Sequence, residues 1–161
     1  MEIREATPQD WPAIYPFWSQ IVEARESYVY PLGASSDEAR AIWMQAPPAH
    51  VVVAVDGDGV LGSATMGPNK AGPGSHVATG SFMVGPEAQG RGVGRALGEY
   101  LIDWSRRSGF RGIQFNAVVE TNAPAVHLWK SLGFAVIGTV PEAFDSASHG
   151  LVGLHVMYQK L

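Results

Sequence analysis

The sequence predicts a mixed α/β fold, with a central sheet of about six to seven strands and helices on both faces. Strand-like apolar runs and helix-like segments follow one another in the order strand, two helices, three strands, helix, strand, helix, two strands. Glycine and proline stand at the boundaries of these segments. A length of 161 residues suits one apolar core, so residues 1–161 are expected to form a single domain.

The first part of the chain predicts a short strand and two helices. Polar and apolar residues alternate over residues 2–5. A helix is expected over residues 8–26, with a break or kink at Pro16, because proline removes a main-chain donor and clashes with the preceding turn. Ser35 is suited to cap a second helix, which ends at residue 44 or 45.

The rest of the chain is predicted to alternate between strands and helices. The expected elements are a hairpin over residues 50–66 with its turn at 56–59, a strand over 76–84, a helix over 92–107, a strand over 112–119, a helix after Asn122, a strand over 134–140, a polar loop over 141–150 and a final strand over 151–160. In the strand over 112–119, simple alternation puts Asn116 and Glu120 on the same face.

A glycine-rich turn between the strand over 76–84 and the following helix is the main candidate for a binding site. Residues 89–94 read Gln-Gly-Arg-Gly-Val-Gly. Because glycine has no side chain, the main-chain N–H groups of this turn lie uncovered at a helix N-terminus. Unpaired donors and the positive end of the helix dipole favour an anion there. The alternative is a tight left-handed turn that only allows close packing.

The residues of this turn distinguish between known phosphate loops. The ATP-type loop is excluded because no Gly-Lys-Ser/Thr is present, and the spacing is not the Gly-x-Gly-x-x-Gly of dinucleotide-binding turns. Gln89, Gly92 and Gly94 instead match Gln/Arg-x-x-Gly-x-Gly. This pattern resembles the pyrophosphate loop of the GNAT superfamily of acetyl-CoA-dependent N-acyltransferases.

A second segment, residues 122–134, resembles the superfamily motif Asn-x-x-Ala-x-x-Leu-Tyr-x-x-x-Gly-Phe in order and spacing. Asn122 can cap the helix that follows it and still offer an amide to the coenzyme. Gly133 stands just past the helix end and suits a left-handed C-cap. The looser resemblance extends over essentially the whole chain.

The resemblance implies a GNAT-like sheet that is splayed between its fourth and fifth strands to admit the pantetheine arm of acetyl-CoA. It also implies main-chain donors for the tetrahedral oxyanion near Met83 and Val84. The residues predicted to contact the coenzyme are Met83, Val84, Gln89, Gly90, Arg91, Gly92, Val93, Gly94, Arg95, Asn122 and Trp129.

Trp129 is the main departure from the superfamily pattern, which has a tyrosine at this position. That hydroxyl is thought to protonate the departing thiolate, and an indole cannot replace it as an acid. The preferred interpretation is a tryptophan that packs beside the coenzyme, with solvent or the coenzyme supplying the proton.

Four residues are candidates for the acceptor side. Tyr28 and Tyr30 lie in the loop that lines the acceptor pocket of the superfamily, although one could pack on the sheet and the other could be exposed. Asn116 is a candidate substrate-binding amide. Glu120 is the candidate base for the acceptor amine, with a solvated carboxylate at a strand end as the alternative.

Composition limits the partners of the chain. With 11 Lys plus Arg, a net charge of −4 and no basic run, no nucleic-acid partner is expected. No metal is expected, because the chain has no cysteine and its histidines lack ligand spacing. No apolar run approaches the roughly 20 residues of a membrane-spanning helix, and the polar start predicts a cytoplasmic protein without a membrane partner. A homodimer is possible by resemblance.

These observations lead to three hypotheses, given in order of preference. The first is an N-acetyltransferase that moves an acetyl group from acetyl-CoA to the amine of a small molecule or amino acid by direct attack. The second is a non-catalytic acyl-CoA-binding sensor or scaffold, because Trp129 replaces the tyrosine and no clear base is present. Both predict coenzyme binding, and only the first predicts turnover. The third is a phosphate-binding enzyme of another kind, which requires that a nucleotide outcompete coenzyme A in a thermal-shift assay.

Overall fold

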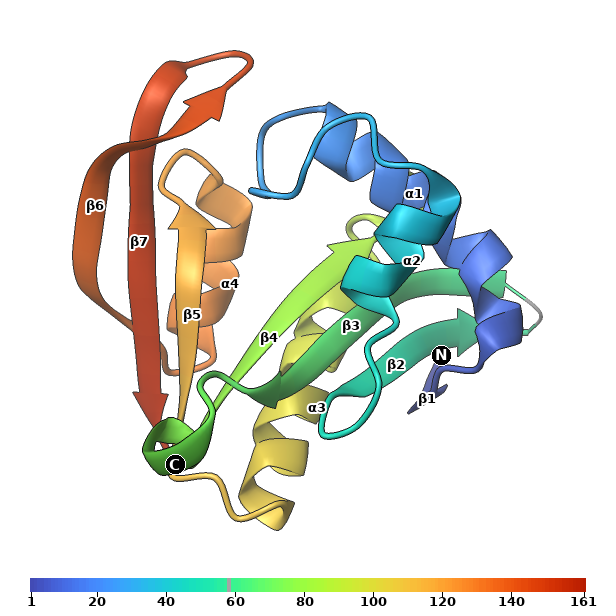
Figure 1. Cartoon of the computed structure of the whole chain (residues 1–161), viewed down its shortest axis with the longest axis horizontal. Coiled ribbons are helices and arrows are strands. Elements are labelled where there is room, and N and C mark those ends of the chain that lie inside the picture. Colours follow the sequence, from blue (N-terminus) through green and yellow to red (C-terminus); the bar gives the residue numbers. More distant parts are fainter. Residues whose placement is uncertain (58) are drawn as a thin grey trace.

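The computed structural model describes residues 1–57 and 59–161 and confirms the mixed α/β fold (Figure 1). The seven strands are β1 (Glu2–Glu5), β2 (His50–Asp56), β3 (Gly59–Pro68), β4 (Val77–Val84), β5 (Gly112–Val119), β6 (Ala135–Ser146) and β7 (Gly150–Lys160). The α-helices are α1 (Trp11–Glu23), α2 (Ser36–Trp43), α3 (Val93–Arg107) and α4 (Ala123–Ser131). The predicted turn at residues 56–59 includes position 58, which lies outside the described residues.

The sheet has the order β1-β2-β3-β4-β5-β7-β6, and its central pair opens into a wedge. β4 and β5 run parallel and pair only at Val77 with Gly112 and at Ala78 with Ile113. Beyond these two pairs the strands diverge, as Figure 1 shows, while β3 and β4 stay paired without a register shift. The splay therefore leaves one edge of β4 without a strand partner from residue 79 onward.

Helices cover both faces of the sheet, in agreement with the prediction. On one face α3 and α4 enclose a core that includes Leu97, Leu101 and Trp129. On the other face α1 and α2 enclose a second core that includes Trp18 and Trp43. Burial of these large apolar side chains is the main stabilising term on each face. Among the described residues, no helix is both long enough and apolar enough to cross a bilayer.

Helix α1 continues through Pro16, so the break that was one of the two predicted outcomes is absent. The helix is continuous from Trp11 to Glu23, with Pro16 inside it. Its buried face, which includes Ile14 and Trp18, packs on the sheet on both sides of the proline. Tertiary packing therefore keeps the chain helical although one main-chain donor is lost.

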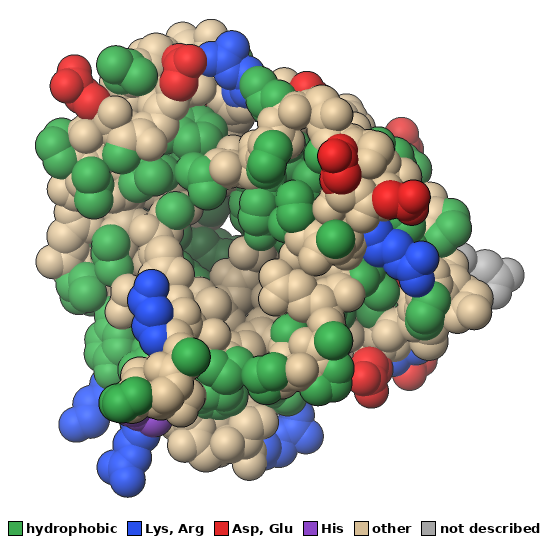
Figure 2. Space-filling model, in the orientation of Figure 1, with side chains coloured by type: hydrophobic (Ala, Val, Ile, Leu, Met, Phe, Trp, Pro, Cys, Tyr) green, Lys and Arg blue, Asp and Glu red, His purple; other side chains and the backbone are tan. Residues whose placement is uncertain are grey.

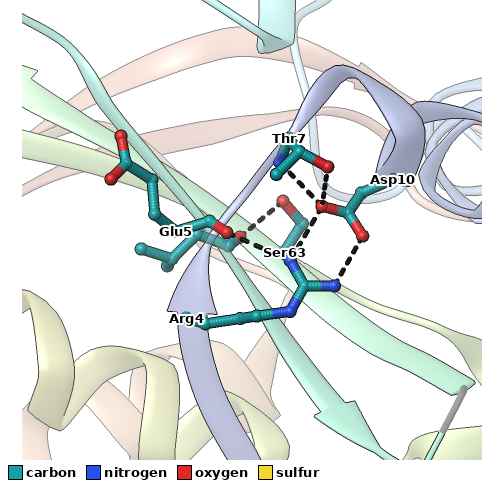
Figure 3. A network of polar contacts seen from close by, with 6 residues as sticks. Arg4, Glu5, Thr7, Asp10 and Ser63 are labelled. Atoms are coloured by element: carbon teal, nitrogen blue, oxygen red, sulfur yellow. Dashed lines mark hydrogen bonds and ion pairs between the residues drawn. The ribbon is translucent and has the colours of Figure 1, made fainter.

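The start of α1 is fixed by an ion pair with β1 (Figure 3). The Arg4 guanidinium donates two hydrogen bonds to the Asp10 carboxylate, at 2.8 and 2.9 Å. The Thr7 N–H and hydroxyl also donate to Asp10. Asp10 is only 8% exposed. The Arg4 hydrogen bond is the largest of the effects that hold the pKa of Asp10 at about 2, and burial opposes it.

The last hairpin is longer than predicted. Residues 141–146, expected as loop, continue β6, and only residues 147–149 form the turn. Pro141 is tolerated because β6 is the edge strand of the sheet. The register with β7 shifts between Val140 and Phe144, and Glu142 there has a left-handed φ of 52°. The predicted loop is therefore an irregular part of an edge strand.

A β-bulge corrects the predicted facing of residues in β5. The register with β7 shifts between Phe115 and Val118, so one extra residue is inserted in β5. Phe115 and Val118 consequently pack into the same core, whereas Val119 packs on the opposite face with Phe144. The prediction that Asn116 and Glu120 share a face is therefore wrong, because the bulge reverses the alternation between them.

Candidate functional site

A cleft of about 790 Å³ lies where β4 and β5 diverge. Figure 2 shows the surface hollowed between the part built on β5 to β7 and the part built on α1 and α2, with many hydrophobic side chains around the hollow. The cleft is lined by the loop after α1, the edges of β4 and β5, the turn before α3 and one side of α4. Most predicted site residues line it, and the exceptions are Arg91 and Glu120.

The glycine turn presents main-chain donors to the cleft. Gly90 and Gly92 have φ values of 75° and 80°, in the left-handed region that glycine adopts without strain. Ala96 makes the first intrahelical bond of α3, to the Gly92 carbonyl at 3.0 Å. The N–H groups of residues 93–95 precede it and therefore have no acceptor within the helix. A Cβ at Gly92 would meet no heavy atom within 4 Å, and Gly92 lines the cleft together with residues 93–95.

The two arginines of this turn differ in position. Arg91 points to the β2–β3 hairpin, where it forms an ion pair with Asp56 at 2.8 Å, and it does not line the cleft. Arg95 lines the cleft and donates to the Ser131 hydroxyl on α4 at 2.7 Å. The N–H groups and Arg95 together form an arrangement that fits a diphosphate.

Helix α4 packs closely on α3 and carries the second motif. The Asn122 side chain accepts from the Ala125 N–H at 3.4 Å, which confirms it as the N-cap. Gly133 has a φ of 97°, which confirms the left-handed C-cap. A Cβ at Gly98 would come within 2.9 Å of the Trp129 ring, so the glycine permits this close approach.

Trp129 is 7% exposed and belongs to an aromatic cluster at the base of the cleft. Its ring lies 4.7 Å from Phe82 and 4.8 Å from Phe115, measured between centroids, and 6.1 Å from Phe134. This packing supports the interpretation of Trp129 as hydrophobic mass beside the coenzyme site.

The unpaired edge of β4 carries main-chain donors and acceptors into the cleft. The Phe82 N–H donates to the Tyr28 hydroxyl oxygen at 2.8 Å, and the Tyr28 O–H donates to the Phe82 carbonyl. Both groups of Phe82 therefore point away from β3. Because successive residues of a strand point to opposite edges, Val84 also directs its N–H into the cleft, whereas Met83 directs its own toward β3.

Phe82 was missed in the sequence. The prediction placed the donors near Met83 and Val84 without assigning the edge to which each residue points. The strand boundaries alone do not say which residues of β4 direct their N–H groups toward β3 and which toward the cleft. The signal that could have supplied it is the apolar side chain of Phe82, which belongs to the α3–α4 core, whereas Met83 belongs to the core under α1 and α2.

Tyr28 and Tyr30 form an aromatic stack on the α1–α2 side of the cleft. Their rings are parallel within 5° at 5.3 Å, and Tyr30 in turn stacks on Trp18 at 5.7 Å. The Tyr30 hydroxyl donates to the Ser81 hydroxyl at 3.2 Å. Burial raises the pKa of both tyrosines, most strongly for Tyr28, where the N–H of Phe82 opposes the shift.

Asn116 lines the cleft at the β5 bulge and is paired with another amide. Its side-chain N–H donates to the Asn69 carbonyl oxygen at 2.7 Å, and the Asn69 amide donates back at 3.2 Å. Gln114 also donates to the Asn116 oxygen, at 3.0 Å. Asn116 is exposed, so this amide network is open to a ligand.

Glu120 stands away from the cleft. Its carboxylate accepts a hydrogen bond from the Gly153 N–H on β7 at 2.6 Å, and its own N–H donates to the Gly153 carbonyl at 3.1 Å. A Cβ at Gly153 would lie 2.9 Å from this carboxylate. The contacts therefore orient Glu120 toward β7, and the structure does not bring it together with Tyr28, Tyr30 and Asn116.

A set of contacts, here named the clasp, ties the loop after α1 to the tip of the β6–β7 hairpin. It consists of Arg25, Glu26, Asp145, Ser146 and Ser148. Arg25 forms an ion pair with Asp145 at 2.6 Å. The Glu26 carboxylate accepts from the Ser146 hydroxyl at 2.6 Å and from the Ser148 N–H at 2.9 Å. The clasp therefore joins the two sides of the wedge next to the tyrosine loop.

No group of three or more His, Cys, Asp or Glu side chains in residues 1–57 and 59–161 could hold a metal ion. The described lining of the cleft contains one charged side chain, Arg95, and otherwise hydroxyl, amide and apolar groups. This donor set suits an organic ligand with an anionic group near α3.

Comparison with protein families gives a match over most of the chain. The model of the acetyltransferase (GNAT) family matches residues 12–134. This range contains both motif segments.

Solved structures and a curated relative are similar to the chain. A GCN5-related N-acetyltransferase from Kribbella flavida is 59% identical, with a TM-score of 0.96 over 99% of this chain and 97% of that chain. The putative acetyltransferase yncA from Salmonella typhimurium, solved with its cofactor acetyl-CoA, is 28% identical with a TM-score of 0.83, over 100% of this chain and 94% of that one. The L-amino acid N-acyltransferase MnaT of Escherichia coli is 33% identical over 57% of this chain and 54% of its own length. The matched region spans between 13% and 54% of the length of the curated relatives, including 43% of the N-acetyltransferase aca1 of Schizosaccharomyces pombe.

Proposed function

The chain belongs to the acetyltransferase (GNAT) family, and from this premise we propose that it transfers an acetyl group from acetyl-CoA to the amine of a small molecule or amino acid. The observation that carries the proposal is the wedge between β4 and β5, which ends at the glycine turn before α3. A ligand that lies in this wedge contacts the main chain of β4 along the length of the ligand, and one end of the ligand reaches the N–H groups at the start of α3. An extended arm with a terminal diphosphate fits that sequence of groups.

The residues of the turn suit the diphosphate of coenzyme A. The N–H groups of residues 93–95 lack helical acceptors, and the space in front of Gly92 is open. The positive end of the helix dipole adds to the attraction. Arg95 reaches the same part of the cleft and can pair with one phosphate oxygen.

The reaction needs a main-chain donor where negative charge develops. The Val84 N–H points to the cleft and has no strand partner on that edge among the described residues. The acceptor nitrogen attacks the thioester carbon, and the resulting oxyanion needs a hydrogen-bond donor on this edge of β4. Trp129 cannot supply a proton, so the departing thiolate takes one from solvent.

The acceptor side is expected to be the part of the cleft next to α1 and α2. It presents the hydroxyl of Tyr30, the hydroxyls of Thr79 and Ser81, and the Asn116 amide network. The similarity to an L-amino acid N-acyltransferase supports a small acceptor, including an amino acid. A homodimer, a cytoplasmic location and the absence of nucleic-acid and membrane partners stay predictions.

A thiol-release assay tests the proposed function. The protein is mixed with acetyl-CoA and a panel of L-amino acids together with primary amines without a carboxylate, such as benzylamine. Acceptor-dependent release of free thiol supports the transferase. If the protein binds coenzyme A in calorimetry but no acceptor increases thiol release, the transferase proposal fails.

The predicted base, Glu120, is tested by Glu120→Gln. Glutamine keeps an oxygen that can accept from the Gly153 N–H, but it cannot take a proton from the acceptor. A base role predicts a fall in kcat/KM of about 10² to 10⁴. An unchanged kcat/KM would assign the carboxylate to the β5–β7 contact alone.

The alternative function is a non-catalytic acyl-CoA-binding sensor or scaffold. Two observations favour it: Trp129 is packed in an aromatic cluster, and Glu120 does not line the cleft. Coenzyme binding without acceptor-dependent turnover in the assay above is the outcome that this alternative predicts.

A further inference from the structure

The Tyr28 hydroxyl has an unusual position in the wedge. A side chain from the loop after α1 reaches the unpaired edge of β4 and bonds to both main-chain groups of Phe82. These groups would pair with a neighbouring strand in a regular sheet. Tyr28 thus places an O–H donor on the same strand edge as the Val84 N–H, at the position of Phe82.

The surroundings of Tyr28 hold its ring in place. The ring stacks on Tyr30 at 5.3 Å, and Tyr30 is fixed by Trp18, by the edge of Trp43 and by the Ser81 hydroxyl. The loop that carries both tyrosines is also anchored by the clasp. The phenolic oxygen is therefore preorganised, and its hydrogen is the part that can turn about the C–O bond.

We propose that Tyr28 is a catalytic residue that donates its hydroxyl hydrogen to the thioester oxygen when that oxygen becomes negative. The inference rests on the proposed acetyl transfer. The phenolic oxygen keeps the hydrogen bond from the Phe82 N–H, while its O–H exchanges the Phe82 carbonyl for the oxyanion. The N–H donor polarises the hydroxyl and strengthens the bond that it donates.

The step balances without a change in the protonation of Tyr28. The lone pair of the acceptor nitrogen forms the new C–N bond, and the π pair of the carbonyl moves to oxygen. When the C=O bond re-forms, the C–S bond breaks and its electron pair leaves on sulfur. The nitrogen loses its proton to solvent, and water protonates the thiolate.

The environment of Tyr28 suits a donor that stays protonated. Burial is the largest cause of its raised pKa, and the neighbouring Tyr30 adds to it. The hydroxyl therefore carries its hydrogen at neutral pH, which a hydrogen-bond donor to an oxyanion requires. This role differs from acceptor binding, the role that the sequence predicts for Tyr28.

Tyr28→Phe tests the proposal in the full chain, with acetyl-CoA and the amine that gives the highest turnover in the panel above. We expect kcat to fall by about 10² to 10³, as for loss of one oxyanion donor, while the KM for acetyl-CoA changes less than threefold. Tyr15→Phe is the matched control. The Tyr15 hydroxyl donates to the Ala34 carbonyl at 3.3 Å, outside the cleft lining, so its kcat should stay within twofold.

A second variant separates hydrogen donation from a structural role. A fluorinated tyrosine at position 28 keeps the ring and the hydroxyl but ionises at lower pH than tyrosine. Because a more acidic phenol donates a stronger hydrogen bond, kcat at neutral pH should change as the number of fluorine atoms on the ring increases, whereas a purely structural hydroxyl would leave kcat unchanged.

Three results would overturn the proposal. They are a Tyr28→Phe variant with wild-type kcat, a tighter binding of acetyl-CoA without loss of kcat in that variant, and an unchanged kcat at neutral pH in the fluorinated variants. A wild-type protein that binds coenzyme A without turnover would instead reject the proposed function, and the role of Tyr28 with it.

Discussion

Substitution of Gly92 by valine tests whether the turn before α3 binds the coenzyme diphosphate. Gly92 has a φ of 80°, and a Cβ there would meet no protein atom within 4 Å. The added Cβ would therefore meet no protein atom, and because Gly92 lines the cleft beside residues 93–95, we expect the side chain to occupy part of the site. The variant should fold, with a strained turn and a partly blocked site.

The magnitude follows from two separate effects. A non-glycine residue in the left-handed region lowers the free energy of unfolding by about 1–2 kcal/mol. A hydrogen bond to a charged group contributes about 1.5–3 kcal/mol, and each 1.4 kcal/mol is a factor of ten in affinity. Loss of one N–H contact to a phosphate should therefore weaken coenzyme A binding by about 10-fold to about 100-fold.

Gly109 provides a matched control at the other end of the same helix. It has a φ of 82°, and a Cβ there would also meet no heavy atom within 4 Å. Gly109→Val should lower the free energy of unfolding by a similar amount and leave the affinity unchanged. Urea unfolding measures the first quantity and isothermal titration with coenzyme A the second.

Equal affinities in the two variants would refute the reasoning. If Gly92→Val bound coenzyme A as tightly as the wild type, the turn would lie outside the binding site. If Gly109→Val lost affinity to the same extent, the effect would arise from strain in α3 and not from the N–H groups.

Three further predictions follow from other contacts. Gly98→Ala should lower the free energy of unfolding by about 1 kcal/mol, because the new methyl group would lie 2.9 Å from the rigid Trp129 ring. Urea titration measures this change, and a stabilised variant would contradict the close packing of α3 on α4. Asp10→Asn should remove a pH dependence. Hydrogen bonds from Arg4 and Thr7 hold the pKa of Asp10 at about 2, so the stabilisation by the ionised carboxylate is complete above about pH 4 and is lost as the pH falls through 2. This stabilisation amounts to about 2 kcal/mol, and parallel acid-unfolding curves for wild type and variant would exclude it. Glu26→Ala should raise the KM for the acceptor by about 10-fold, because the clasp positions the loop that carries Tyr28 and Tyr30. The coenzyme A affinity should stay within twofold. An equal change in both constants would mean that the substitution disturbs the whole cleft.

The turns and caps of the coenzyme site could be predicted because their rules are local. A glycine just past a helix end, as at Gly109 and Gly133, adopts a left-handed φ that other residues avoid. Asn122 caps α4 for a similarly local reason. The order of strands and helices followed from periodicity over short windows, and the parallel β4–β5 pair agrees with the splay that the resemblance implied.

The acceptor side could not be predicted to the same degree because it depends on distant contacts. Tyr28 and Phe82 are separated by 54 positions, and nothing local to either residue indicates their pairing. The bulge at Asn116 has no glycine or proline to mark it, yet it reverses the faces of all later residues in β5. Pro16 and Pro141 both indicated interruptions, but packing of α1 and the edge position of β6 allowed regular structure to continue.

The divergence of β4 from β5 also bears on pairing of this strand edge with another chain. An unpaired strand edge normally offers a template on which another polypeptide can polymerise. Here the edge lies inside the cleft. The Tyr28 hydroxyl already bonds to the N–H and the carbonyl of Phe82, which are the groups that a strand from another chain would need. The edge of β4 is therefore open to a narrow ligand in the cleft but is protected from pairing with a strand of another chain.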